Sequence, residues 1–150
     1  MKLKEGLRFP DFSLLDDQGK EFRLNRDVNT KYTVLYFYPK DETPGCTKQA
    51  CFFRDSYNEF KEYDCEIIGI SGDRQTSHER FKSNHNLPFK LLSDVQGKLR
   101  KKLELPKDFF GLSPGRITFL INSELEILFI FRSSLNMESH ISSVLSFLKK

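Results

Sequence analysis

The chain has 150 residues, with 24 basic and 21 acidic side chains and a formal net charge of +3, a length typical of one domain that needs no disulfide or metal to hold its core. The interleaved charges argue against a nucleic-acid-binding protein, no apolar run is long enough for a membrane span, and the first residues lack the apolar stretch of a signal peptide. Three cysteines are too few for a secreted disulfide scaffold, so we expect a reducing, cytoplasmic setting.

The N-terminal part of the chain predicts a β-hairpin and then a buried strand. Residues 12–15 and 21–24 are the hairpin strands, separated by a turn of two aspartates, a glutamine and a glycine. Residues 33–38 (TVLYFY) are a β-branched and aromatic run typical of a buried parallel strand. Pro39 ends that strand, because a proline donates no N–H to the ladder.

A helix is expected to follow a turn at residues 41–45, with Pro44 suited to its first positions. One apolar stripe at helical spacing runs along it: Cys46, Ala50, Phe53, Tyr57 and Phe60. Residues 65–70 (CEIIGI) then predict a second buried strand, which closes a β-α-β unit.

The second half of the chain alternates short helices and strands. We expect an exposed helix at 73–86, a strand at 89–92, a short helix at 97–103 and a loop at 106–115. Residues 117–122 and 125–131 predict another hairpin, and 137–148 an amphipathic helix capped by Asn136. The order predicts a single α/β domain over residues 1–150, a mixed central sheet flanked by helices with an N-terminal β-hairpin.

Cys46 lies where chemistry is expected, after the carboxyl end of a predicted strand and in the first turn of a helix. The positive end of a helix favours the thiolate, which is the nucleophilic form of cysteine. Thr43 places a hydroxyl three residues earlier, and Cys51 supplies the second thiol that a sulfenic acid needs for condensation to a disulfide. A lone cysteine on an apolar face is usually a small buried hydrophobe. The combination here favours a reactive dithiol.

The segment at residues 39–57, PKDETPGCTKQACFFRDSY, resembles the active-site segment of the peroxiredoxins, a family of thiol-dependent peroxidases. It is most similar to the peroxiredoxin Q, or bacterioferritin comigratory protein, subfamily. The family motif Pro-x-x-x-Thr-x-x-Cys is matched by Pro39, Thr43 and Cys46. The family's late active-site arginine corresponds to Arg116 in GLSPGRITFLIN. The similarity runs from about residue 9 to residue 147 and implies a thioredoxin-like fold.

The resemblance also implies an activity, the reduction of hydrogen peroxide and organic hydroperoxides to water and alcohols. Cys46 would be the peroxidatic nucleophile, with Arg116 stabilising its thiolate, Pro39 shielding it from water and Thr43 orienting the peroxide. Cys51 would resolve the sulfenic acid as an intrachain Cys46–Cys51 disulfide, which thioredoxin or a similar dithiol then reduces. No cofactor is implied. Because resolution within one chain needs no second subunit, we expect a monomer.

Two other functions compete with a peroxidase. A disulfide oxidoreductase on the same fold is disfavoured, because such enzymes use Cys-x-x-Cys and four residues separate Cys46 from Cys51 here. A redox-sensing module without enzymatic activity is the other alternative. Cys65 opens a predicted core strand and is interpreted as structural, since buried thiols are usually inert. No group of histidines and cysteines has zinc-site spacing, so no metal is predicted.

Overall fold

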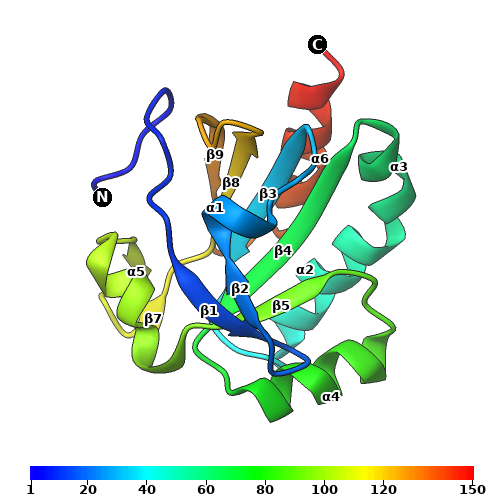
Figure 1. Ribbon diagram of the computed structural model, residues 1–150. Coiled ribbons are helices and arrows are strands. Elements are labelled where there is room, and N and C mark those ends of the chain that lie inside the picture. The colour runs from blue at the N-terminus through cyan, green and yellow to red at the C-terminus, as the bar shows by residue number, and fades with distance from the viewer.

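A mixed sheet of seven strands runs through the centre of the protein, whose computed structural model describes residues 1–150 (Figure 1). The strand order is β2-β1-β5-β4-β3-β8-β9. These strands are β1 (Ser13–Asp16), β2 (Glu21–Arg23), β3 (Tyr32–Phe37), β4 (Cys65–Ser71), β5 (Lys90–Ser93), β8 (Ile117–Asn122) and β9 (Ile127–Arg132). Two further short strands, β6 (Lys107–Asp108) and β7 (Ser113–Pro114), form a separate small hairpin.

The helices connect these strands and cover the sheet. They are α1 (Leu24–Asp27), α2 (Pro44–Asp55), α3 (Tyr57–Glu62), α4 (Gln75–His85), the 3₁₀ turn η1 (Val95–Gly97), α5 (Lys98–Lys102) and α6 (Met137–Leu148). None of them combines the length and the hydrophobicity that crossing a bilayer requires.

Strands β3, β4 and β5 are parallel neighbours, so their carboxyl ends meet at one edge of the sheet. β8 pairs antiparallel with β3 on its other side, and the register places Phe37 opposite Ile117. The residue that precedes β8 therefore lies beside the carboxyl end of β3. This arrangement confirms the predicted β-α-β unit and brings a late segment of the chain to the start of α2.

Successive side chains of β3 enter two separate apolar cores, because a strand alternates its faces. Leu35 and Phe37 belong to the core formed with the N-terminal segment and α5, whereas Val34 and Tyr36 belong to the core formed with α2, α3, α4 and α6. Each fully buried large apolar side chain contributes roughly 1.5–3 kcal/mol. Aromatic rings dominate the second core, where Tyr36 stacks on Phe53 with ring centroids 4.5 Å apart. This core anchors the α2 face that carries Cys46.

Several predicted elements are confirmed, but the predictions for residues 106–115 and 73–86 are wrong in detail. The N-terminal hairpin, the 117–122 strand and the final helix with its Asn136 cap are present; Asn136 Oδ1 accepts from the Ser139 amide at 3.1 Å. The predicted loop at 106–115 contains the β6–β7 hairpin. The helix predicted as exposed at 73–86 is exposed on one face only, because His78 and Phe81 on its other face are fully buried.

The apolar stripe from Cys46 to Phe60 was predicted on one helix, and this is wrong. The helix is interrupted at Ser56, whose backbone (φ −99°, ψ 3°) leaves the α-helical region, and α3 begins at Tyr57. Tyr57 is half-buried: its ring packs against the edge of the second core beside Phe89, and its hydroxyl donates to Glu66 at 3.0 Å. Phe60 is fully buried in that core. Both rings therefore pack against the second core, although they belong to the helix that follows the interruption.

Candidate active site

Cys46 lies in the first turn of α2 and is almost completely buried, with 1% of its surface exposed. The chain leaves β3, turns through Pro39 and Thr43, and enters the helix at Pro44. Gly45 leaves room for Arg116, because a Cβ at this position would lie 2.7 Å from Arg116 Nη2 and would displace the guanidinium group. The helix start is therefore shaped to let a guanidinium group approach.

Two N–H groups reach the Cys46 sulfur. Arg116 Nη1 donates to Sγ at 3.1 Å, and the backbone amide of Lys40 donates at 3.5 Å. Arg116 is 8% exposed and comes from the residue before β8, which the pairing of β8 with β3 holds beside the end of β3. A permanent cation and an oriented amide are the groups that stabilise an anionic sulfur.

Thr43 and Pro39 line a small cavity together with Arg116, the residue that donates to this sulfur. The cavity encloses about 250 Å³, and we call it the reactive cavity; its lining residues are Pro39, Thr43, Asp108, Phe109, Ser113, Pro114, Arg116 and Ser134. Thr43 Oγ1 donates to the Lys40 carbonyl at 2.8 Å, which leaves the oxygen free to accept a hydrogen bond. The structure thus brings together all four of the residues Pro39, Thr43, Cys46 and Arg116.

Cys51 and Cys65 have different surroundings. All three cysteines are free thiols, and Cys51 is half-buried on α2 while Cys65 is fully buried at the start of β4. Burial raises the pKa of the Cys65 thiol to about 12, so this thiol stays protonated and unreactive at neutral pH. This agrees with the structural role expected for Cys65.

Gln49 is a site residue that sequence reasoning missed. It is fully buried, and its Oε1 accepts from Arg116 Nη1 at 3.0 Å. Its Nε2 is buried without a hydrogen-bond partner. Gln49 follows Cys46 by three residues, so the two side chains share a helix face. That spacing was the available signal, and it was overlooked because a glutamine in a helix is usually exposed.

Three more missed residues lie next to the site: Asp41, Asp73 and His78. Their potential ligand atoms lie within 4.8 Å of one another. These atoms already form hydrogen bonds within the protein: Asp41 Oδ2 accepts from Ser77 Oγ, and Asp73 Oδ2 accepts from the Asp41 amide. The cluster is therefore a hydrogen-bond network, and its chemistry does not call for a metal. No sequence pattern relates Asp41 to His78, because they belong to a turn and to a later helix.

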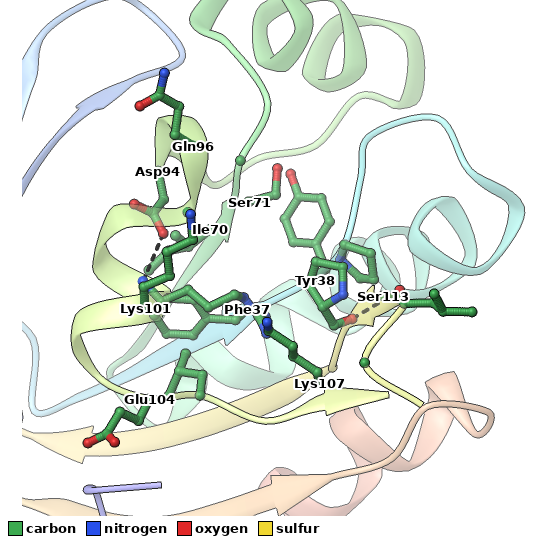
Figure 2. A pocket seen from close by; sticks show the side chains of 18 residues that line it. Phe37, Tyr38, Ile70, Ser71, Asp94, Gln96, Lys101, Glu104, Lys107 and Ser113 are labelled. Atoms are coloured by element: carbon green, nitrogen blue, oxygen red, sulfur yellow. Dashed lines mark hydrogen bonds between the residues drawn. The ribbon is translucent and has the colours of Figure 1, made fainter. Parts of the chain in front are cut away.

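A larger cavity of about 490 Å³ lies at the carboxyl ends of β3 and β4, under α5 and the β6–β7 hairpin (Figure 2). Phe37 and Ile70 form part of its lining, and Lys101, Glu104 and Lys107 are on its walls (Figure 2). It shares Pro39, Ser113 and Pro114 with the reactive cavity. Arg116 lines the reactive cavity but not this larger one, so the larger cavity is separate from the donor to the Cys46 sulfur.

Comparisons with known proteins agree over nearly the whole chain. The profile of the AhpC/TSA family matches residues 6–130. The chloroplastic peroxiredoxin Q of Suaeda salsa is 46% identical over 99% of this chain and 69% of that protein, and that of Arabidopsis thaliana is 48% identical over 99% and 68%. Peroxidoxin BcpB from Mycobacterium tuberculosis superposes with a TM-score of 0.89 at 34% identity, covering 98% of this chain and 97% of that one. Peroxiredoxin Q from Xanthomonas campestris gives a TM-score of 0.82 at 30% identity, covering 92% and 89%.

Proposed function

This chain belongs to the AhpC/TSA family and to its peroxiredoxin Q branch, and from that premise we propose which residues carry its thiol-dependent peroxidase activity. The thioredoxin-like fold expected from the sequence is confirmed. The observation that carries the assignment is the 3.1 Å contact between the Cys46 sulfur and Arg116, which lines a cavity together with Thr43 and Pro39.

In the first step the Cys46 thiolate attacks one oxygen of the peroxide, and the O–O bond breaks. The sulfur keeps the attacked oxygen as sulfenic acid, and the other oxygen takes up a proton and leaves as water or an alcohol. Arg116 holds the negative charge before attack and polarises the peroxide oxygens during it. Thr43 offers its free lone pairs to the peroxide O–H, and Pro39 limits the access of water.

In the second step the Cys51 thiol attacks the sulfenic sulfur of Cys46. Water leaves, and an intrachain Cys46–Cys51 disulfide forms. A dithiol of the thioredoxin type then returns both cysteines to thiols by exchange. Family membership therefore supports a peroxidase over the two alternatives, the disulfide oxidoreductase and the redox-sensing module.

The remaining expectations stay proposals. Resolution within one chain needs no cysteine from a second subunit, which supports a monomer built from one domain over residues 1–150. The plant relatives named above are chloroplastic proteins, so the cytoplasmic setting expected from the cysteine count stays a prediction.

The direct test is to add one equivalent of hydrogen peroxide to the reduced protein and to locate the thiols that disappear. We expect Cys46 and Cys51 to be lost together as one disulfide, and Cys65 to remain a thiol after unfolding and alkylation. Peptide mass spectrometry with differential alkylation measures this. A disulfide that includes Cys65, or three intact thiols, would contradict the proposal.

Replacing Arg116 by methionine is expected to slow the oxidation of Cys46 by about 100-fold, the usual effect of losing one donor to a developing charge. Rapid-mixing kinetics under single-turnover conditions measures the rate. Arg116→Lys is the matched control, because it keeps a positive charge but replaces the planar guanidinium group, whose Nη1 donates to both Cys46 and Gln49. We expect the rate of Cys46 oxidation in Arg116→Lys to lie between those of the parent and the methionine variant. If Arg116→Met reacts at the parent rate, Arg116 has no role in the reaction.

A further inference from the structure

The loop between β3 and α2 is held by a buried polar network that the peroxidase mechanism does not use. Its centre is Asp41, whose side chain is 1% exposed. Tyr38 Oη donates to Asp41 Oδ1 at 2.6 Å, while Ser77 Oγ and His78 Nδ1 lie 2.9 Å and 2.7 Å from Oδ2. The pKa of Tyr38 is raised well above its usual value by burial, so this hydroxyl remains a donor.

His78 links this carboxylate to the sheet. Its Nε2 lies 3.0 Å from the carbonyl oxygen of Leu92 in β5, an atom that can only accept. Its ring is fully buried. The imidazole is thus clamped between a backbone carbonyl of a central strand and the carboxylate of the loop, which gives the loop a rigid reference point.

The network also reaches the backbone that faces the Cys46 sulfur. The peptide joining Lys40 to Asp41 is fixed on both sides, because its carbonyl accepts from Thr43 Oγ1 at 2.8 Å and its amide donates to Asp73 Oδ2 at 2.8 Å. Pro39 fixes the chain just before it. Between these restraints lies the Lys40 amide, which points at the Cys46 sulfur.

We propose that Asp41 and His78 are positioning residues for the reaction of Cys46: clamped between Leu92 and the loop, they hold the Lys40 amide on the Cys46 sulfur. The lysine side chain is exposed and takes no part. The inference rests on the proposed function, and it adds a second, backbone-derived donor to the one that Arg116 supplies. Neither residue touches the sulfur.

Substitutions that separate the two ends of the His78 clamp test this role. The amide group of asparagine takes the place of Nδ1, so His78→Asn can keep a hydrogen bond to Asp41 and loses the one to Leu92. The longer glutamine takes the place of Nε2, so His78→Gln can keep a hydrogen bond to Leu92 and loses the one to Asp41. Asp41→Asn removes an acceptor of both Ser77 and His78, and Ser77→Ala removes one half-buried donor with little risk to folding. Ser83→Ala, exposed on the same helix, is the control.

Two rates are measured on each full-length protein: Cys46 oxidation by hydrogen peroxide in a single turnover and Cys46 alkylation by iodoacetamide. We expect His78→Gln and Asp41→Asn to lower both rates by about 10-fold or more, since misplacing a group by about 1 Å costs up to about 100-fold. Ser77→Ala and His78→Asn, each of which loses one tie of the network, are expected to lower them by about 3-fold, and Ser83→Ala to stay near the parent. Thermal unfolding midpoints are recorded in parallel.

Parent-like rates in His78→Gln and Ser77→Ala would overturn the inference. So would equal losses in His78→Asn and His78→Gln that follow their unfolding midpoints, because that pattern is expected of a purely structural histidine. Failure of the proposed function has a different signature: the parent and Ser83→Ala would both fail to form sulfenic acid at Cys46. In that case the alkylation rates of the variants would still test whether Asp41 and His78 affect the reactivity of Cys46.

Discussion

Replacing Cys46 by serine is expected to abolish peroxide consumption. A serine hydroxyl is not ionised at neutral pH and is a far weaker nucleophile than a thiolate toward a peroxide oxygen. The surrounding donors, Arg116 and the Lys40 amide, would remain but would have no reactive group to act on. Peroxide loss is measured with excess thioredoxin-type reductant. Cys65→Ala is the matched control and should retain activity, because Cys65 lies at the start of β4 with a pKa of about 12.

Replacing Cys51 by serine is the companion experiment and should give a different result. The first turnover should proceed at the parent rate, because Cys51 is half-buried on α2 and contacts neither Arg116 nor the Lys40 amide. The reaction should then stop with Cys46 as sulfenic acid, which a dimedone adduct would reveal by mass. Parent-like consumption of peroxide by Cys46→Ser would remove Cys46 from the mechanism. Sustained turnover by Cys51→Ser would remove Cys51 as the resolving thiol.

Formation of the Cys46–Cys51 disulfide is expected to unwind the first turns of α2. Both cysteines lie on this helix, which is continuous from Pro44 to Asp55 in the reduced protein. Positions five apart in a helix have Cα atoms roughly 8–9 Å apart, whereas a disulfide requires roughly 4.4–6.8 Å. An intact helix therefore cannot contain the bond. The unwinding starts where the helix has fewest internal hydrogen bonds, at its N-terminus.

Amide hydrogen exchange measures this change. In the disulfide form, amides from residue 46 to residue 53 should exchange at least about 100-fold faster than in the reduced protein, because their opening no longer requires subglobal unfolding. Strand β4 is the internal control and should stay protected, since it pairs with β3 and β5 on both sides. Equal protection of α2 in the two forms, with the Cys46–Cys51 bond verified by mass spectrometry, would show that the helix accommodates the disulfide in another way.

The same unwinding would release Cys46 from its two donors. Arg116 and the Lys40 amide contact the sulfur only while the first turn of α2 is formed. In the proposed mechanism the folded helix would be the form that reacts with peroxide, and the unwound segment would be the form that presents the disulfide to the reductant. Because Asp41 is tied to His78 and precedes the helix, we expect the unwinding to begin after this residue.

Features that depend only on neighbouring residues could be predicted from the sequence. The strand, turn and helix around Cys46 follow from a β-branched run, two prolines and a helical stripe, all within about 25 positions. The Asn136 cap and the N-terminal hairpin are equally local. The Cys46 and Cys51 pair is visible because both thiols belong to one helix. The role of Arg116 came from family resemblance alone, since nothing near it in the sequence indicates a partner.

Long-range strand pairing and helix packing determine which distant groups meet around Cys46. Pairing of Phe37 with Ile117 carries Arg116 to the end of β3, and the packing of α4 carries His78 to Asp41. These contacts depend on strand register and helix packing, which are properties of the whole sheet and its two cores. A local pattern contains no information about register between strands about 80 residues apart in the sequence. The sequence therefore shows that Arg116 and His78 are polar residues, but it does not show that their partners are Cys46 and Asp41, because those contacts depend on long-range pairing.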